Sequence, residues 1–219
     1  MNELVNTAHV SHNGISNLHD LLRHETRQEH HDLEKALDLF SDQFNVTDYR
    51  NLLLKLFVFH VAFDAYLAVK GHEGIIAEKF YLEGRSKKTW LAQDVNFMGI
   101  DNVANIRNLS YDDLATLLPS TEHIWGAIYV IEGSTLGGEI LAKHFTKTLG
   151  LFPETGLRFF TAYGSQTKAK WNETIWQLNA LDKQDVRHAD IIVGAKRTFG
   201  FLKLHLTDGM AGPSCRAIF

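Results

Sequence analysis

Three glycines interrupt an otherwise helical pattern in the stretch Tyr129-Val-Ile-Glu-Gly-Ser-Thr-Leu-Gly-Gly-Glu-Ile-Leu-Ala-Lys-His-Phe145. Glycine within a helix costs about 1 kcal/mol relative to alanine, so Gly133, Gly137 and Gly138 together forfeit roughly 3 kcal/mol of local helix preference. A helix without Cβ atoms at these positions can bend, and a flat, bulky group can approach its main chain to contact distance. Close packing of two helices is the alternative, and for this stretch alone it is the simpler explanation.

Outside this stretch, the 219-residue chain has the composition of a soluble globular protein, with 45% hydrophobic and 22% charged residues. Its formal net charge of −4 gives no global electrostatic basis for binding nucleic acid, although a net count leaves a local basic patch open. Cys215 is the only cysteine and forms no internal disulfide, which favours a reducing, cytoplasmic location. Residues 1–15 lack the basic start and apolar core of a secretory signal, and no segment approaches the length of a membrane span.

Apolar residues recur at helical spacing through most of the chain. We predict helices over 15–40, 49–69, 75–82, 85–98, 120–149, 166–181 and 185–206. Residues 100–118 are expected to be irregular or weakly helical, and no stretch of useful length alternates as a strand would. The pattern predicts an all-α, single-domain fold over residues 15–208, between a flexible N-terminal segment, 1–14, and a C-terminal tail, 209–219.

The first predicted helix carries a histidine at the edge of its apolar stripe. Such a residue, here His30, is most often a hydrogen-bonded core histidine. Glu34 follows four residues later on the same face, within reach of an imidazole nitrogen. Because a metal-binding imidazole commonly has its other N–H held by such an acceptor, the pair is a candidate ligand and partner. A Glu34 that faces solvent and pairs with a lysine or arginine is the alternative, and these residues alone favour neither.

Two arginines precede this histidine on the same broad face of the helix. Arg23 and Arg27 stand seven and three positions before His30. Guanidinium groups at the rim of a pocket can hold the carboxylates of a ligand whose flat body lies deeper. Basic residues on a helix are usually solvated, so the arginines support a ligand site only in combination with the histidine and the glycines.

Taken together, these segments resemble the heme oxygenase family, and in particular its bacterial members. The run Leu22-Arg-His-Glu-Thr-Arg-Gln-Glu-His-His-Asp-Leu-Glu34 is similar to the family's proximal helix, in which a threonine precedes the iron-ligating histidine by four residues. Residues 85–99 are similar to the middle helix and 133–138 to the distal helix. Residues 156–161 and 195–199 are similar to segments near the family's C-terminus, so the resemblance covers nearly the whole chain after residue 15.

On one side of the site, the resemblance implies a heme b held by the proximal helix. His30 is the implied iron ligand, and Glu34 is its hydrogen-bond acceptor. Arg23 and Arg27 match basic family positions that face the heme propionates, and Lys170 is a weaker match from a later helix.

On the other side, the resemblance implies that the glycine-bent distal helix covers the heme. Gly133, Gly137 and Gly138 are the expected contacts, and Phe199 matches an aromatic residue that lines the pocket. Many family members carry an aspartate directly after the first distal glycine, whereas this chain has Ser134. A hydroxyl is not an anionic acceptor, so the resemblance implies a differently built water network around Ser134.

The activity that the resemblance implies is oxidative ring-opening of heme to biliverdin, with release of carbon monoxide and ferrous iron. The expected partners are O2, an electron donor such as ferredoxin or a reductase, and a phytochrome that accepts the bilin. A heme-binding or heme-trafficking protein without turnover would use the same His30 and glycines. A di-iron oxygenase would need paired Glu-x-x-His-type motifs, and Asp185-x-x-His188 is the only acid-x-x-His motif in the chain.

Overall fold

The structure is a computed structural model that describes residues 17–71, 76–100, 108–181 and 187–208. Within these ranges the chain is helical, with isolated β-bridges at Phe152 as the sole extended pairing, which confirms the all-α prediction. The predicted segments 1–14 and 209–219 lie outside the described residues. The α-helices are α1 (Leu18–Glu25), α2 (Arg27–Leu37), α3 (Val46–Gly71), α4 (Ile76–Leu82), α5 (Lys88–Phe97), α6 (Tyr111–Leu117), α7 (Thr121–Leu149), α8 (Thr167–Leu181) and α9 (His188–Thr207).

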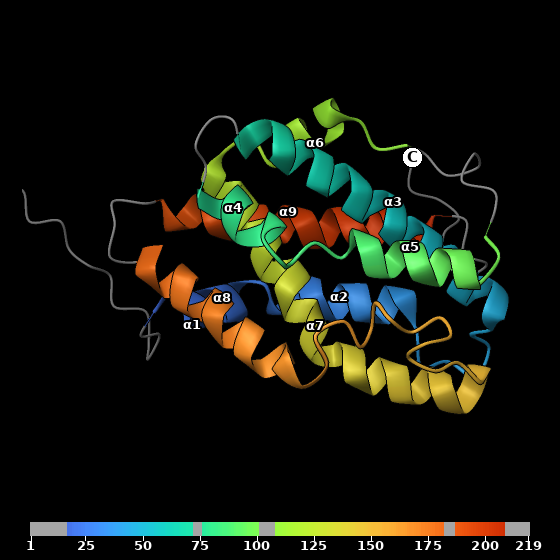
Figure 1. The fold of residues 1–219 in the computed structure, drawn as a ribbon. Helices are drawn as coiled ribbons and strands as arrows, with labels where there is room; N and C mark the ends of the chain where they lie inside the picture. Colours follow the sequence, from blue (N-terminus) through green and yellow to red (C-terminus); the bar gives the residue numbers. More distant parts are fainter. Residues whose placement is uncertain (1–16, 72–75, 101–107, 182–186, 209–219) are drawn as a thin grey trace, which may run out of the picture.

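Helix α3 supplies much of the hydrophobic core, and α4, α5 and α6 pack against it (Figure 1). Its side chains Leu53, Phe59 and Phe63 are at most 1% exposed. The expectation that no segment reaches the length of a membrane span is wrong on length and composition, because Val46–Lys70 passes both criteria among the described residues. Of its most apolar 18-residue window, 61% is buried inside the domain, so protein packing accounts for its hydrophobicity.

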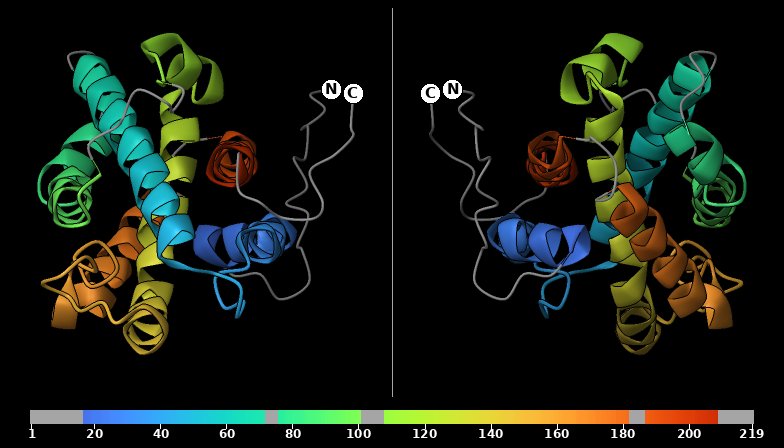
Figure 2. Two further views of the ribbon diagram at one scale, coloured as in Figure 1. Left: turned by 90° about the vertical axis from the view of Figure 1, so that its right-hand side faces the viewer. Right: turned by 90° about the vertical axis from the view of Figure 1, so that its left-hand side faces the viewer.

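Helices α7 and α9 cross in direct backbone contact. A Cβ atom on Gly126 of α7 would lie 2.2 Å from the carbonyl oxygen of Ile191, and one on Gly194 of α9 would lie 2.4 Å from that of His123. Helix α2 packs on α9 as well, and Figure 2 shows the end-on α9 above α2 and beside α7. One helix, α9, therefore positions both α2 and α7.

The predicted first helix is divided at Thr26, so the prediction of one continuous helix is wrong there. Helix α1 ends at Glu25, and Thr26 has φ −105° and ψ 6°. Its hydroxyl donates to the Leu22 carbonyl oxygen at 2.8 Å. A threonine that bonds back to the preceding turn competes with regular helix geometry, which accounts for the change of direction between α1 and α2.

The glycine-bearing stretch lies within one continuous helix, as predicted. Helix α7 runs from Thr121 to Leu149 and ends at Gly150, whose φ of 69° suits glycine. Figures 1 and 2 show that its first and second halves run in different directions, so the helix bends without a break. Within the weakly predicted region 100–118, α6 begins with a capping box between Ser110 and Asp113.

Candidate functional site

His30 is part of α2, and its imidazole packs beside α9 and is open to solvent. Its side chain is 57% exposed, and its ring meets the ring of Phe199 edge-on at 5.6 Å. Nδ1 lies 3.5 Å from Glu34 Oε2. Since that carboxylate faces Nδ1, and Nε2 has no hydrogen-bond partner among the described residues, the geometry leaves Nε2 available to a ligand.

An exposed apolar face on α7 contains two of the three glycines. Gly133, Leu136, Gly137 and Ile140 follow the i, i+3, i+4, i+7 spacing of a single helix face, which we call the glycine stripe. Leu136 is 45% and Ile140 62% exposed, although both are large hydrophobic residues. No atom of another element lies within 4 Å of a Cβ placed on Gly137. An exposed apolar surface of this kind is typical of a ligand-binding face.

Contacts at both ends of the glycine stripe turn it toward α1 and α2. Tyr129, one turn before the stripe, has its ring 6.4 Å from that of His19 in α1. His144, one turn after it, has its ring 4.8 Å from that of Phe40, just beyond α2. Among the described residues, no hydrogen bond or ring contact joins the stripe itself to α2. Helix α7 therefore contacts α1 and the segment after α2 through residues on either side of the stripe, and not through the stripe itself.

The three basic residues predicted for the site lie in different surroundings. Arg23 and Arg27 are exposed on α1 and α2, and neither forms an ion pair with a described residue. Lys170 lies in α8, where its ammonium is 3.9 Å from a carboxylate oxygen of Glu173. The two arginines are free to bind an anionic group, whereas Lys170 already has a carboxylate partner.

The remaining distal residues differ in what surrounds them. A Cβ atom on Gly138 would lie 2.4 Å from the carbonyl oxygen of Phe160, so backbone packing explains this glycine. A Cβ atom on Gly133 would meet the Trp171 ring at 3.5 Å, an ordinary contact. Ser134 is exposed, and its hydroxyl donates to the carbonyl oxygen of Ile131 at 2.8 Å.

His60 of α3 is a buried histidine of the core. It is 3% exposed, its Nδ1 is 3.4 Å from the Tyr81 hydroxyl, and its ring contacts that of Phe159. Burial lowers the pKa of His60 to about 3, so its imidazole is neutral near pH 7.

Two stripe residues were missed by the sequence reasoning. Leu136 and Ile140 stand three residues after Gly133 and Gly137, respectively, and that spacing was the available signal. Hydrophobic residues on a helix are ordinarily assigned to the core, which conceals an exposed apolar face.

Protein side chains alone do not form a metal centre in the described part of the chain. No group of three or more His, Cys, Asp or Glu residues there could hold a metal ion. A metal at His30 would therefore need ligands other than these side chains, such as a bound organic group or water. A flat ligand that carries its own metal, with carboxylates for the arginines, fits this surface.

Comparisons with known proteins agree with this description. A sequence profile of the heme oxygenase family matches residues 16–207, while no curated protein sequence matches the chain significantly. Solved structures of similar fold include a heme oxygenase from Leptospira interrogans, with 19% identity, a TM-score of 0.71, and coverage of 88% of this chain and 100% of that one.

Two further structures show the same fold. A heme oxygenase from Neisseria meningitidis, in NO- and CO-bound forms, has 23% identity and a TM-score of 0.67, over 88% of this chain and 91% of that one. Heme oxygenase-1 from the cyanobacterium Synechocystis, in complex with heme, has 20% identity and a TM-score of 0.67, over 88% and 92%. With the profile match over nearly the whole chain, this protein is an enzyme of the heme oxygenase family.

Proposed function

We propose that this enzyme binds heme b between α2 and the glycine stripe, with His30 as the iron ligand, and opens the macrocycle to biliverdin. Carbon monoxide and ferrous iron are the other proposed products. O2 is the oxidant, and ferredoxin or a reductase supplies the electrons. The observation that carries this proposal is the exposed, apolar glycine stripe on α7, whose flanking residues contact α1 and the segment after α2, together with the open imidazole of His30 on α2.

The side chains on both walls fit the chemistry of heme. Leu136 and Ile140 offer apolar surface to the macrocycle, and Gly137 leaves the main chain open to close approach. Arg23 and Arg27 lack ion-pair partners among the described residues and suit the two propionates. These features make the site amphipathic in the sense that heme requires.

In the proposed reaction, the protein orients the iron ligand, shields heme from bulk water and holds protons near it. Glu34 Oε2 lies 3.5 Å from Nδ1 of His30 and can accept a hydrogen bond from Nδ1–H, which would favour the tautomer whose Nε2 lone pair can bind iron. Bound heme supplies the oxidative chemistry at its iron and is itself the substrate. Because Gly133 and Gly137 have no side chain, α7 could lie close to a bound heme and exclude bulk water from it.

Ser134 is the proposed contact for water near the reacting face. Its hydroxyl hydrogen is committed to the carbonyl oxygen of Ile131, so the oxygen remains an acceptor for a water molecule. A neutral acceptor of this kind orders water without adding a negative charge. The proton route therefore relies on water held by backbone groups of α7 as well as on Ser134.

The cellular location of the reaction and the use of its products are also part of the proposal. We place the reaction in the cytoplasm, which the single cysteine favours. A phytochrome that accepts the bilin is a proposed partner, and release of iron for nutrition is the alternative use of the same reaction. Identification of the biliverdin isomer helps to separate these roles, because a photoreceptor requires one defined chromophore.

An anaerobic titration with ferric heme, followed by air and a reductant, tests the proposed function. Heme binding should give a histidine-ligated spectrum, and turnover should abolish the Soret band and yield one predominant biliverdin isomer. Catalase and a matched sample of free heme control for degradation by peroxide. Stable heme binding with a persistent Soret band under reductant and air would contradict the proposal and support a binding or trafficking protein.

A further inference from the structure

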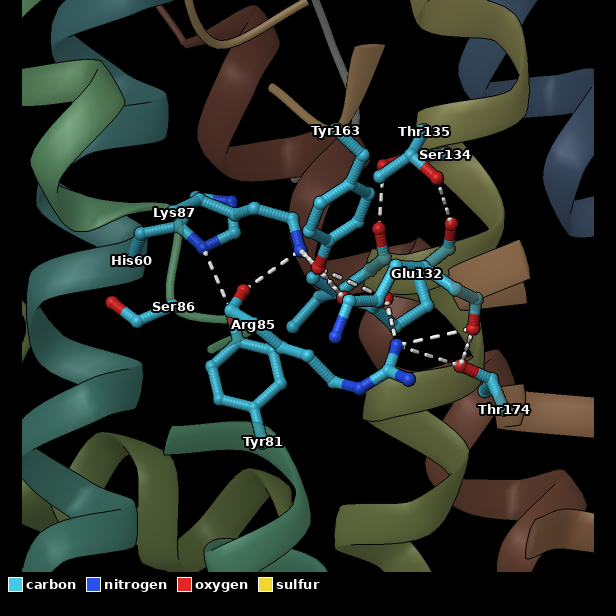
Figure 3. Close-up of polar contacts among 12 residues, drawn as sticks. His60, Tyr81, Arg85, Ser86, Lys87, Glu132, Ser134, Thr135, Tyr163 and Thr174 are labelled. Atoms are coloured by element: carbon cyan, nitrogen blue, oxygen red, sulfur yellow. Dashed lines mark hydrogen bonds and ion pairs between the residues drawn. The ribbon is translucent and has the colours of Figure 1, made fainter. Parts of the chain in front are cut away.

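A buried cluster of charges lies at the start of the glycine stripe, around the residue that precedes Gly133 (Figure 3). The carboxylate of Glu132 is fully buried and is held by Arg85 at 2.6 Å and Lys87 at 2.5 Å. Both cationic side chains are 1% exposed. The Tyr163 hydroxyl lies 3.0 and 3.1 Å from the two carboxylate oxygens. We call Glu132, Arg85, Lys87 and Tyr163 the Glu132 cluster.

The Glu132 cluster ties α7 to three other parts of the fold. Arg85 and Lys87 come from the connection between α4 and α5, and Tyr163 comes from the segment before α8. Arg85 also donates to Thr174 and pairs with Glu173, both in α8. Apolar residues of similar volume often stabilise a fold as well as buried ion pairs do, so a role in fixing one arrangement is the better reason for this cluster.

The cluster acts at the place where α7 is weakest by itself. Glu132 directly precedes Gly133, and its side chain points about 100° round the helix axis from the stripe. Gly133, Gly137 and Gly138 lower the helix preference of residues 133–138, which we call the glycine turn. A Cβ atom placed on Gly137 would meet no atom of another element within 4 Å. The position of this turn therefore depends on contacts from residues outside it.

A second anchor holds the other end of the same turn and comes from the same loop. The carbonyl oxygen of Phe160 packs directly on Gly138. This loop is in turn fixed by the buried carboxylate of Asp94, which accepts the backbone N–H groups of Arg158 and Phe159. One loop thus holds the glycine turn at both ends, through Tyr163 before it and Phe160 after it.

We propose that the Glu132 cluster is a positioning device, which sets where the glycine turn of α7 lies over the bound substrate. None of its residues needs to touch heme. Burial raises the pKa of Tyr163, so its hydroxyl stays protonated and donates to Glu132 across the physiological range. The inference rests on the proposed function, since the object being positioned is the helix over heme.

The test compares two variants with a matched control in the heme-free protein. Tyr163→Phe removes one hydroxyl, and Glu132→Gln removes the buried charge. Tyr66→Phe is the control, because its buried hydroxyl donates to the Leu118 carbonyl oxygen, away from the glycine turn. Amide hydrogen exchange should quicken about tenfold at residues 134–138 in Tyr163→Phe, as expected for one hydrogen bond lost to a charged group, and should be unchanged at 124–130.

The same variants are then loaded with heme, and the biliverdin isomers are separated. The isomer ratio should shift in Tyr163→Phe and stay unchanged in Tyr66→Phe. Unchanged exchange at 134–138 in Tyr163→Phe, or equal loosening along all of α7, would overturn the inference, as would an unshifted isomer ratio despite faster exchange. Should the wild-type protein yield no bilin, the proposed function fails, while the exchange measurement still decides whether the cluster holds the turn. If Glu132→Gln does not fold, Tyr163→Phe carries the test.

Discussion

Alanine at two adjacent glycines of α7 should change the stability of the heme-free protein in opposite directions. At Gly138 the new Cβ atom would lie 2.4 Å from the carbonyl oxygen of Phe160, and that backbone must move by roughly 1 Å to reach ordinary contact. Because a backbone carbonyl must move, overpacking here should cost about 2–3 kcal/mol, the upper part of the range for overpacked sites, against about 1 kcal/mol gained in helix preference. We expect Gly138→Ala to lose about 1–2 kcal/mol of unfolding free energy.

Gly137→Ala is the matched control, because its Cβ atom would meet nothing within 4 Å. Only the gain in helix preference applies, so the heme-free protein should become more stable by up to about 1 kcal/mol. The assay is urea unfolding followed by far-ultraviolet circular dichroism, where a difference of about 2 kcal/mol between the variants separates the midpoints by roughly 1 M.

Heme binding should reverse the order of the two variants. The added methyl group of Gly137→Ala stands in the glycine stripe and should weaken heme affinity, whereas that of Gly138→Ala points toward the Phe160 loop. Equal stability of the two heme-free variants, or a Gly138→Ala protein as stable as the wild type, would refute the assignment of Gly138 to packing. Unchanged heme affinity in Gly137→Ala would refute the assignment of Gly137 to the ligand face.

Three further predictions concern single features of the site and the core. Ser134→Ala should keep most of the turnover rate, because the hydroxyl is a neutral acceptor only; complete loss in a steady-state assay would show that it is indispensable. Arg23→Ala combined with Arg27→Ala should weaken heme affinity by up to about thirtyfold at low salt and less at high salt, since exposed ion pairs contribute up to about 1 kcal/mol each and are screened; a salt-independent affinity equal to wild type would contradict it. Burial gives His60 a pKa of about 3 in the folded protein, against an ordinary value of 6.5. Between pH 6.5 and pH 3 the imidazole therefore binds a proton only in the unfolded chain. The unfolding free energy should fall as the pH drops through this range, by up to about 1.4 kcal/mol per pH unit. Urea unfolding at pH 7.5 and 5.0 should show a smaller fall in His60→Gln than in wild type, and an equal fall would contradict the neutral state of His60.

Most of the helices could be predicted because they depend on local periodicity. The spacing of apolar residues predicted the extent of α7 and its continuity through the glycines, and the structure confirms both. The spacing of apolar residues could not predict the break between α1 and α2 at Thr26. It depends on whether the threonine hydroxyl turns back to the Leu22 carbonyl oxygen, and the apolar stripe continues across the break.

The two kinds of glycine could not be separated from sequence because their neighbours come from a distant loop. Gly138 meets Phe160, whereas Gly137 meets nothing, yet the residues are adjacent and chemically identical. The same loop brings Tyr163 to Glu132. Charged residues are usually solvated, so a sequence pattern gives no reason to bury Glu132 with two cations, and only the tertiary arrangement reveals them.

The ligation of heme iron by His30 is tested most directly by the spectrum and turnover of His30→Ala, with and without added imidazole. Because Nε2 of His30 is the proposed ligand, the variant should lose the histidine-ligated spectrum and nearly all bilin formation. Imidazole should restore both, since a free ring can occupy the space that the side chain leaves beside Phe199. A wild-type spectrum and normal turnover in His30→Ala without imidazole would contradict the proposed site.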